Sequence, residues 1–310
     1  MGDNCAVMFD DLLQQGGLSL DRLQSFCRVA EAGGVTKAAK GDPTRQSLFS
    51  RQIKELEEFF CAELVRRSGR GVVLTAAGRR LHALAREQLA GLQDFKQECA
   101  GEKSQLTLAA GDSLIQWVLL PKLSGLFPKL PNVALRLLNL SSTEIVSGLA
   151  DGTLDLGILR KGAASKMVCA PLGCVSFSLF VPSRLLVEKG ASDLSGSVIE
   201  HLPLATLEGT GAFRSELVRL ARRKKAVFNI KLELSSFPLV AKAVQGGTCA
   251  ALLPSLARSE FSAGDTVELR PDWLRPLERE IVLAWNPRLV RIRTAVSNAI
   301  PIFKAACRVQ

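Results

Sequence analysis

The 310-residue chain has no tyrosine and only two histidines, His82 and His201. Histidine is the commonest general acid–base group and the commonest metal ligand, so its scarcity leaves little material for either chemistry. Neither histidine is accompanied by a nucleophile motif or a carboxylate pair. We therefore expect a protein that is not an enzyme and that carries no metal and no cofactor.

The chain also lacks a charged-then-apolar leader and any apolar run of about 18 residues, the length needed to span a membrane. Its eight cysteines are scattered, with no CxxC pair and no histidine placed to complete a zinc site. A cytoplasmic protein with reduced thiols and no membrane partner is expected. Cys169 and Cys174, five positions apart on an expected loop, leave open a redox pair, against the ordinary behaviour of free cysteine as a small buried hydrophobe.

Basic residues are present in excess and concentrate near the N-terminus. The formal net charge is +10, and residues 22–86 contain 13 Lys and Arg against 6 Asp and Glu. Such a balance favours a polyanionic or anionic partner. An apolar content of 47% indicates that the chain can bury real cores, and its length predicts two or three domains.

Residues 35–60 predict two helices joined by a tight turn at Gly41-Asp42-Pro43, with Thr44 or Asp42 as the cap of the second helix. The second helix has apolar residues spaced by four, three and four positions, at Phe49, Ile53, Leu56 and Phe60. Its other face and its start are basic and polar, with Arg45, Gln46, Ser47, Arg51 and Lys54. This pattern fits a helix pushed into a nucleic-acid groove, and equally an ordinary amphipathic helix with a solvated face.

Residues 63–74 follow as two short apolar segments around Ser68-Gly69-Arg70-Gly71, which predicts a β-hairpin with arginines at its tip. A basic hairpin after a helix-turn-helix is typical of a wing lying along a phosphate backbone or minor groove. The alternative is a plain surface hairpin with solvated charges. Residues 1–17, before this unit, are expected to be a loose extension.

A long helix over residues 76–99, capped by Thr75, is predicted next. Its apolar positions Leu81, Ala85, Leu92, Phe95 and Cys99 have near-heptad spacing. A domain of about 60 residues cannot cover so long a stripe, which favours a homodimer through this helix and possible homotetramers. The competing interpretation is a helix folded back on its own wing unit.

Residues 104–310 alternate between apolar strands and helices, the first of which is expected over residues 112–126. This alternation predicts α/β lobes with parallel sheets buried on both faces. The chain is expected to cross between two lobes near 181–184 and again near 273–279. Lobe I would comprise 104–181 and 276–310, and lobe II 182–275.

Two segments carry a specific resemblance: LQSFCRVAEAGGVTKAA, and QSLFSRQIKELEEFFCAELVRRSGRGVVLTAAG. They resemble the winged helix-turn-helix of LysR-type transcriptional regulators. Residues 119–160 are similar to the first half of that family's two-lobed, periplasmic-binding-protein-like effector domain. The resemblance implies a DNA-binding domain at 18–75, a linker and dimerisation helix at 76–103 and an effector-binding domain at 104–310.

This resemblance implies a sequence-specific regulator whose operator binding is modulated by a small molecule between the lobes. DNA contacts are expected from Thr36, Lys37, Arg45, Gln46, Ser47, Ser50, Arg51, Arg67 and Arg70. The family's recognition helix usually begins Ser-Gln-Pro-Ala, whereas this chain has Arg45-Gln46-Ser47-Leu48. Arg45 could read guanine or hold a phosphate, and Arg51 could instead pair with Glu55 within the helix.

The effector site is expected where strands of the two lobes end at helix N-termini. The candidates are Asp112, Ser113, Ser141, Ser142, Arg160, Lys161, Thr206 and Phe237. Hydroxyl donors with Arg160 and Lys161 favour a small anion such as a carboxylate, and Asp112 suggests an amino group on the ligand. A redox-sensing regulator using Cys169 and Cys174 is the alternative. A solute-binding protein would explain the lobes but not the basic N-terminal unit.

Overall fold

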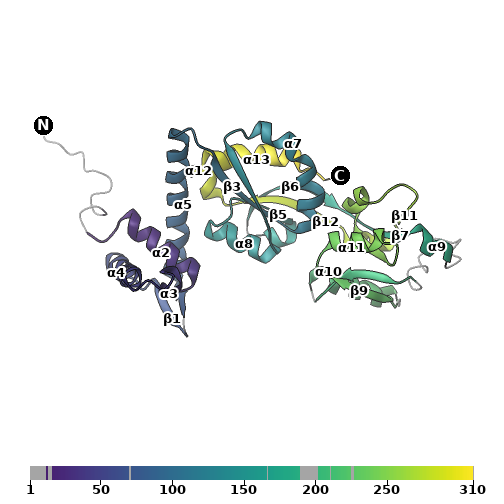
Figure 1. Cartoon of the computed structure of the whole chain (residues 1–310), viewed down its shortest axis with the longest axis horizontal. Coiled ribbons are helices and arrows are strands. Elements are labelled where there is room, and N and C mark those ends of the chain that lie inside the picture. Colours follow the sequence, from purple (N-terminus) through teal and green to yellow (C-terminus); the bar gives the residue numbers. More distant parts are fainter. Residues whose placement is uncertain are drawn as a thin grey trace.

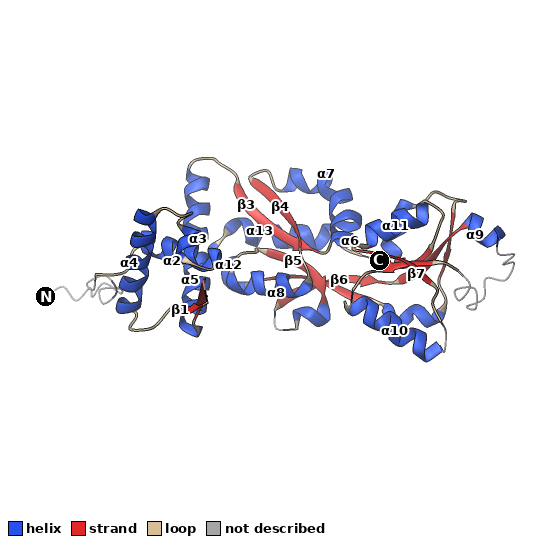
Figure 2. Ribbon diagram, turned by 60° about the horizontal axis from the view of Figure 1, so that its bottom comes forward, coloured by secondary structure: helices blue, strands red, loops and turns tan. Residues whose placement is uncertain are grey.

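The computed structural model describes residues 12, 16–69, 71–165, 167–188, 202–209, 211–224 and 227–309. These residues form a small helical unit, a long helix and two sheet-containing lobes arranged along the long axis of the molecule (Figures 1 and 2). Arg70, His201 and nearly all of the expected N-terminal extension lie outside the described residues. Among the described helices, none is long and apolar enough to cross a membrane.

The helical unit contains α2 (Leu20–Ala32), α3 (Val35–Ala38), α4 (Pro43–Phe59) and a hairpin of β1 (Val65–Ser68) and β2 (Gly71–Leu74). Ser19 caps α2 by accepting the N–H of Arg22, and Gly33 ends it in the left-handed conformation. The predicted stripe of α4 is buried through Phe49, Ile53 and Leu56. Phe60 lies beyond the end of α4 and is exposed, so it does not continue the stripe.

Helix α5 (Ala76–Cys99) joins this unit to the lobes and has two different faces. Thr75 caps it, as predicted, by accepting the Gly78 N–H at 3.0 Å. The single stripe expected from the sequence is wrong, because Leu81 and Ala85 are buried within the chain. The exposed apolar row is instead Leu84, Leu92 and Phe95, which remain 48%, 50% and 64% exposed.

Lobe I is built on a sheet of order β4-β3-β5-β12-β6. Strands β3 (Ser104–Ala110), β4 (Val133–Asn139) and β5 (Leu156–Arg160) are parallel, whereas β12 (Arg279–Trp285) runs antiparallel to β5 and to β6 (Val168–Val175). The expectation of wholly parallel sheets is therefore wrong. Apolar runs show that a strand is buried but not its direction. Besides the helical segment over residues 112–129 described below, the helices of this lobe are α8 (Ser142–Asp151), the short η4 (Lys161–Ala164), α12 (Pro287–Ile292) and α13 (Thr294–Ala306).

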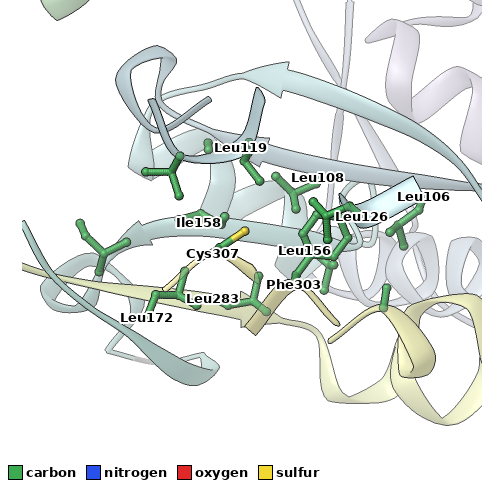
Figure 3. Packing of buried hydrophobic residues seen from close by; sticks show 14 of the residues in the cluster. Leu106, Leu108, Leu119, Leu126, Leu156, Ile158, Leu172, Leu283, Phe303 and Cys307 are labelled. Carbon is green, nitrogen blue, oxygen red and sulfur yellow. The ribbon is translucent and has the colours of Figure 1, made fainter. Parts of the chain in front are cut away.

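The core of lobe I lies between its sheet and α13, where Leu106, Leu108, Leu156 and Leu283 meet Phe303 (Figure 3). Each of these five side chains is fully buried. Burial of a leucine or phenylalanine side chain contributes about 1.5–3 kcal/mol, so this cluster is a main source of the lobe's stability.

Lobe II has the sheet order β11-β7-β10-β8-β9. Its strands are β7 (Phe177–Pro182), β8 (Leu204–Leu207), β9 (Ile230–Leu234), β10 (Ala250–Pro254) and β11 (Thr266–Leu269). Its helices are α9 (Ser183–Glu188), α10 (Ala212–Lys224), α11 (Phe237–Gln245), η6 (Ser255–Glu260) and η7 (Asp272–Leu277).

The chain crosses between the lobes at Ser176 and again at Glu278. The expected first boundary at 181/182 is corrected by β7, which pairs with β10 and β11 and so belongs to lobe II. The first crossing consists of Ser176 alone, and neither a proline nor a charged residue stands next to it. In the sequence, β6 and β7 therefore look like one apolar stretch.

The single helix expected over residues 112–126 is broken into short pieces. They are α6 (Asp112–Leu114), a π-helix η1 (Ile115–Leu119), the 3₁₀ turn η2 (Leu120–Lys122), α7 (Leu123–Leu126) and a final turn η3 (Phe127–Lys129). Pro121 explains the break, because it has no N–H to donate to the preceding turn and its ring crowds the carbonyl there.

Candidate functional site

The turn before α4 decides how the start of this helix is presented. Lys40 and Gly41 both adopt the left-handed conformation, with φ of 51° and 83°. Pro43, at the first helical position, has no N–H, and the Asp42 carboxylate accepts the next two, from Thr44 at 2.9 Å and Arg45 at 3.3 Å. Of the two caps that the sequence allowed, Asp42 is the one used.

The sequence-predicted contact residues of α3 and α4 share one open surface. Thr36 and Lys37 are exposed, and the Thr36 hydroxyl lies 3.5 Å from Gln46 Oε1, linking the two helices. The side chains of Arg45, Ser47, Ser50 and Arg51 are also exposed. The positive end of the α4 dipole adds to this surface, so it is suited to a phosphate oxygen.

Arg45 and Arg51 on this surface form only long ion pairs. Arg45 Nε lies 3.5 Å from Asp42, and Arg51 Nε lies 3.7 Å from Glu55. The same Glu55 carboxylate receives Arg22 Nε at 2.5 Å, a much closer contact. Exposed pairs of this length are worth about 0–1 kcal/mol, so both guanidinium groups remain available to a polyanion.

The hairpin is fixed to the helical unit by backbone contacts. Val72 N–H donates to the Gly33 carbonyl at 3.0 Å, and a Cβ at Gly71 would lie 2.8 Å from the same oxygen. Arg67 is exposed and makes no ion pair with any described residue, while Arg66 pairs with Glu63 at 2.6 Å. Arg70 lies outside the described residues. The hairpin thus presents Arg67 from a rigid base.

The effector candidates of lobe I follow three neighbouring parallel strands. Ala110 is aligned with Asn139 of β4 and with Ile158 of β5, so all three strands end at one edge of the sheet. Asp112 and Ser113, Ser141 and Ser142, and Arg160 and Lys161 follow these ends. We predicted from the sequence that these residues lie together at one edge of the sheet, and the strand register supports this prediction.

Several of these side chains already have partners. Ser141 and Glu144 form a capping box at the start of α8, so the Ser141 hydroxyl acts as a cap. Lys161 donates to Glu280 at 3.0 Å, and this contact raises the pKa of the Lys161 ammonium. Asp112 accepts the N–H of Ser113 at 2.7 Å. Arg160 is half-buried and has no ion-pair partner among the described residues.

In lobe II, Phe237 begins α11, which lies against α6 of lobe I (Figure 2). Asp112 and Phe237 are therefore on contacting elements. Thr206, on β8, is 4% exposed, and its hydroxyl has no hydrogen-bond partner in the described part of the chain. A buried hydroxyl without a partner is energetically costly.

Sequence reasoning missed two groups beside these residues. Phe177 and Phe213 stack at 5.2 Å between ring centroids, and Phe237 packs edge-on to Phe213 at 4.9 Å. Arg279 pairs with Glu216 of α10, and its pKa is lowered by burial and then by the neighbouring Arg160 charge. These partners are far apart in the sequence, and only the scarcity of aromatic residues could have drawn attention to the phenylalanines.

Cys169 and Cys174 do not have the geometry of a disulfide pair. Both lie on the extended strand β6 rather than on the expected loop. At about 3.3 Å per residue their Cα atoms are about 16 Å apart, whereas a disulfide requires about 4.4–6.8 Å. Among the described residues, no group of three or more His, Cys, Asp or Glu could hold a metal ion.

Comparison with known proteins agrees with this architecture. Residues 20–79 match the family model of bacterial regulatory helix-turn-helix proteins of the lysR family, and residues 100–300 match the LysR substrate binding domain. A probable nitrogen assimilation transcriptional activator of Synechococcus elongatus is 28% identical over 276 residues, covering 86% of this chain and 88% of the relative. A probable hydrogen peroxide-inducible genes activator of Mycobacterium leprae is 25% identical, covering 76% and 77%.

Solved structures with the same fold include ArgP from Mycobacterium tuberculosis, with a TM-score of 0.65, 19% identity and coverage of 90% and 98%. LysG from Corynebacterium glutamicum with bound effector Arg has a TM-score of 0.60, 18% identity and coverage of 92% and 99%. The winged helical unit, the two-lobed domain and both family models together identify this chain as a member of the LysR family of transcriptional regulators, with a DNA-binding helix-turn-helix and an effector-binding domain.

Proposed function

We propose that this regulator reads its operator with the N-terminal half of α4, aided by α3 and the β1–β2 wing. The observation that carries this proposal is the open surface of exposed donors around one helix start. Its exposed members are Thr36, Lys37, Arg45, Ser47, Ser50, Arg51 and Arg67. Gln46 is half-buried beside Thr36, and Arg70 is added from the sequence. Arginine at such a position can contact guanine or phosphate, and hydroxyls can contact either.

The proposed division of labour along the chain is DNA binding at 18–75, linkage and dimerisation at 76–103 and effector binding at 104–310. Two copies would pair through the exposed row of α5, each placing one α4 in a major groove one helical turn from the other. Larger homo-oligomers are compatible with this arrangement. The operator would then be partly palindromic.

Footprinting on the DNA upstream of the chain's own gene, followed by fluorescence anisotropy with the protected fragment, tests DNA reading. The wild-type protein should protect two half-sites. Simultaneous Arg45→Ala and Arg51→Ala should abolish protection, while Arg222→Ala, an exposed arginine on α10 of lobe II, should leave it unchanged. Equal protection by both proteins would place the DNA surface elsewhere.

We further propose that the effector is a small carboxylate with an amino group and an apolar portion, bound between the lobes. Arg160 would bind the carboxylate and Asp112 the amino group. Thr206 would supply a hydroxyl, and the Phe213 and Phe237 rings an apolar wall. Ser113, Ser142 and Lys161 would line the same edge, with Ser141 serving as the cap of α8.

Isothermal titration with a panel of free amino acids and small dicarboxylates tests the effector site. At least one amino acid should bind, and Arg160→Ala should remove its binding. Arg136→Ala, an exposed arginine on the edge strand β4, is the matched control and should bind normally. Binding that survives Arg160→Ala, or binding of dicarboxylates alone, would contradict the proposed ligand class.

A further inference from the structure

A buried ionic cluster joins α5 to lobe I. The Arg293 guanidinium donates to both carboxylate oxygens of Asp94, at 2.7 and 3.0 Å, and also to Asp155. The Gln105 carbonyl accepts a further bond from Arg293 at 2.6 Å. Arg293, Asp94 and Asp155 are 7%, 8% and 4% exposed, so water does not screen these contacts. A two-point bond of this kind fixes orientation as well as distance.

The same cluster holds the starts of two strands whose far ends carry proposed effector residues. Gln105 belongs to β3, and Asp155 immediately precedes β5 and accepts the Thr107 N–H of β3 at 2.7 Å. At its other end β3 leads to Asp112, and β5 ends at Arg160. Arg293 therefore lies at one end of a rigid strand pair, and the proposed effector site lies at the other.

Helix α5 has little freedom to move away from lobe I. Glu87, 1% exposed, accepts the Asn286 amide at 3.0 Å, and Gly91 fits so closely against Ile292 that a Cβ there would clash with its Cγ2. Glu87, Gly91 and Asp94 are spaced by four and three residues and so form one face of the helix. Residues 100–103 form the covalent link between the end of α5 and β3.

We infer that Arg293 is a positioning residue that couples the effector site to the DNA-binding unit by locking α5 to strands β3 and β5. The inference rests on the proposed effector and DNA sites. A shift of the β3–β5 pair moves Arg293, and Asp94 follows because a separated buried charge pair would leave each charge unpartnered. The signal then reaches the α4 helices as a rigid rotation of α5, with no dependence on the 100–103 link.

The first experiment uses neither DNA nor effector. Hydrogen–deuterium exchange is measured in the full-length wild type and in Asp94→Asn, which removes the charge that holds Arg293. Exchange in the 87–99 segment should accelerate at least tenfold, while segments 20–59 and 281–285 stay unchanged. Glu98→Gln, the same change on an exposed residue four positions along α5, is the control and should match the wild type.

Gly91→Ala gives an independent test of the same joint, because its methyl group pushes α5 from Ile292 while every charge stays in place. It should raise exchange in 87–99 as Asp94→Asn does. Wild-type exchange in both variants would show that the cluster does not hold α5, and would overturn the inference.

The second experiment adds the DNA fragment found by footprinting. Thermodynamic linkage is reciprocal, so DNA binding must also affect the proposed effector site. DNA should therefore change exchange in segments 112–117 and 236–245 of the wild type and of Glu98→Gln. Asp94→Asn should bind the same DNA within about threefold and lose this change. A DNA-linked change that persists in Asp94→Asn, or its absence in the wild type, would overturn coupling through Arg293.

The two experiments separate this inference from the function on which it rests. Loss of DNA binding by the wild type would contradict the proposed DNA site, and the exchange experiment without DNA would still decide whether Arg293 holds α5. A variant in which α5 is released, but in which DNA still changes exchange at the effector site, would leave the proposed function intact. It would show that Arg293 does not couple the two sites.

Discussion

Arg51 has two possible partners, and their distances determine its expected behaviour. Its side chain is 70% exposed, and its Nε lies 3.7 Å from Glu55, whose carboxylate is already bonded to Arg22. The intrahelical pair foreseen from the sequence is therefore present but weak. Most of the Arg51 charge is left for an external anion.

Arg51→Ala should weaken operator binding without loss of fold. If Arg51 holds a phosphate, affinity should fall similarly on all sequences and the slope of log affinity against log salt should decrease by about one contact. If it reads guanine, about 1–3 kcal/mol of discrimination at one base pair should disappear. Anisotropy titrations at several salt concentrations distinguish these outcomes, and unchanged affinity would remove α4 from the DNA surface.

Glu260 is a second residue whose hydrogen bonds lead to a testable prediction, in this case about pH. It accepts hydrogen bonds from Gln116 at 2.6 Å and Trp117 at 2.8 Å in lobe I, and from Lys242 at 3.3 Å in its own lobe. Burial tends to raise its pKa, but the bonds from Trp117, Gln116 and Lys242 outweigh burial and lower the pKa below 4.5. The carboxylate is thus a contact between the lobes.

Because the folded pKa of Glu260 is lower than the unfolded one, its stabilising contribution is complete above pH 4.5 and is lost as pH falls through the folded value. Trp117 fluorescence, titrated from neutral to about pH 3, should show a transition below the usual carboxylate range. Glu260→Gln should lack it, and Trp117→Phe identifies the signal. The same transition in Glu260→Gln would assign it to another group.

Among the elements, α5 has the most unusual distribution of side chains. One face is locked to lobe I by Glu87, Gly91 and Asp94, and another leaves Leu84, Leu92 and Phe95 exposed. The heptad pattern correctly indicated a long helix with apolar surface to spare. It could not show which apolar residues are covered, because Leu81 packs among residues of the helical unit such as Phe26 and Phe49, which only the folded structure brings to this helix.

Leu92→Glu should dissociate the proposed dimer, because a charge in the middle of the exposed row would be buried without a partner. Sedimentation velocity should show a monomer, and operator affinity should fall with it. Val227→Glu makes the same change at an exposed site in lobe II and should remain dimeric. A dimer that survives Leu92→Glu would assign its contact to a different surface.

The single helix predicted from residue 112 is broken in the structure, and the cause of the break can be seen in the sequence itself. Pro121 stands in the middle of the expected helix, and the turn before it widens into a π-helix. This widened turn carries Gln116 and Trp117, the two donors to Glu260. The irregular turn therefore supplies one side of the lobe contact.

For the whole molecule, contiguous features were predictable and distant pairings were not. The winged unit could be read from the sequence because its motif, turn and cap lie within about 60 residues. The sheet edge at Asp112, Ser142 and Arg160 followed from strand order along the chain. The Glu216–Arg279 and Arg293–Asp94 pairs join residues on separate elements, and the direction of β12 depends on where the chain returns from lobe II.

Arg293→Met should destabilise the whole chain by about 3–5 kcal/mol, because it leaves the Asp94 and Asp155 carboxylates buried without their partner. Urea unfolding followed by circular dichroism should show the loss. Adding Asp94→Leu should recover part of it, since one unpaired charge is then removed. A loss below about 1 kcal/mol would show that water enters the cluster and compensates both carboxylates.

Because the chain enters lobe II at Ser176 and leaves it at Glu278, lobe II is one continuous insertion in lobe I. Val175 and Arg279 are cross-strand neighbours, so deleting residues 176–278 leaves chain ends that an Asn-Gly turn can close into a hairpin. With Trp117→Gln to remove the newly exposed indole, the shortened protein should fold and bind DNA but ignore the effector, as circular dichroism and anisotropy would show. The peptide bonds beside Ser176 and Glu278 are then natural grafting points, where another sensor half could be transplanted to give the same DNA reader a new stimulus.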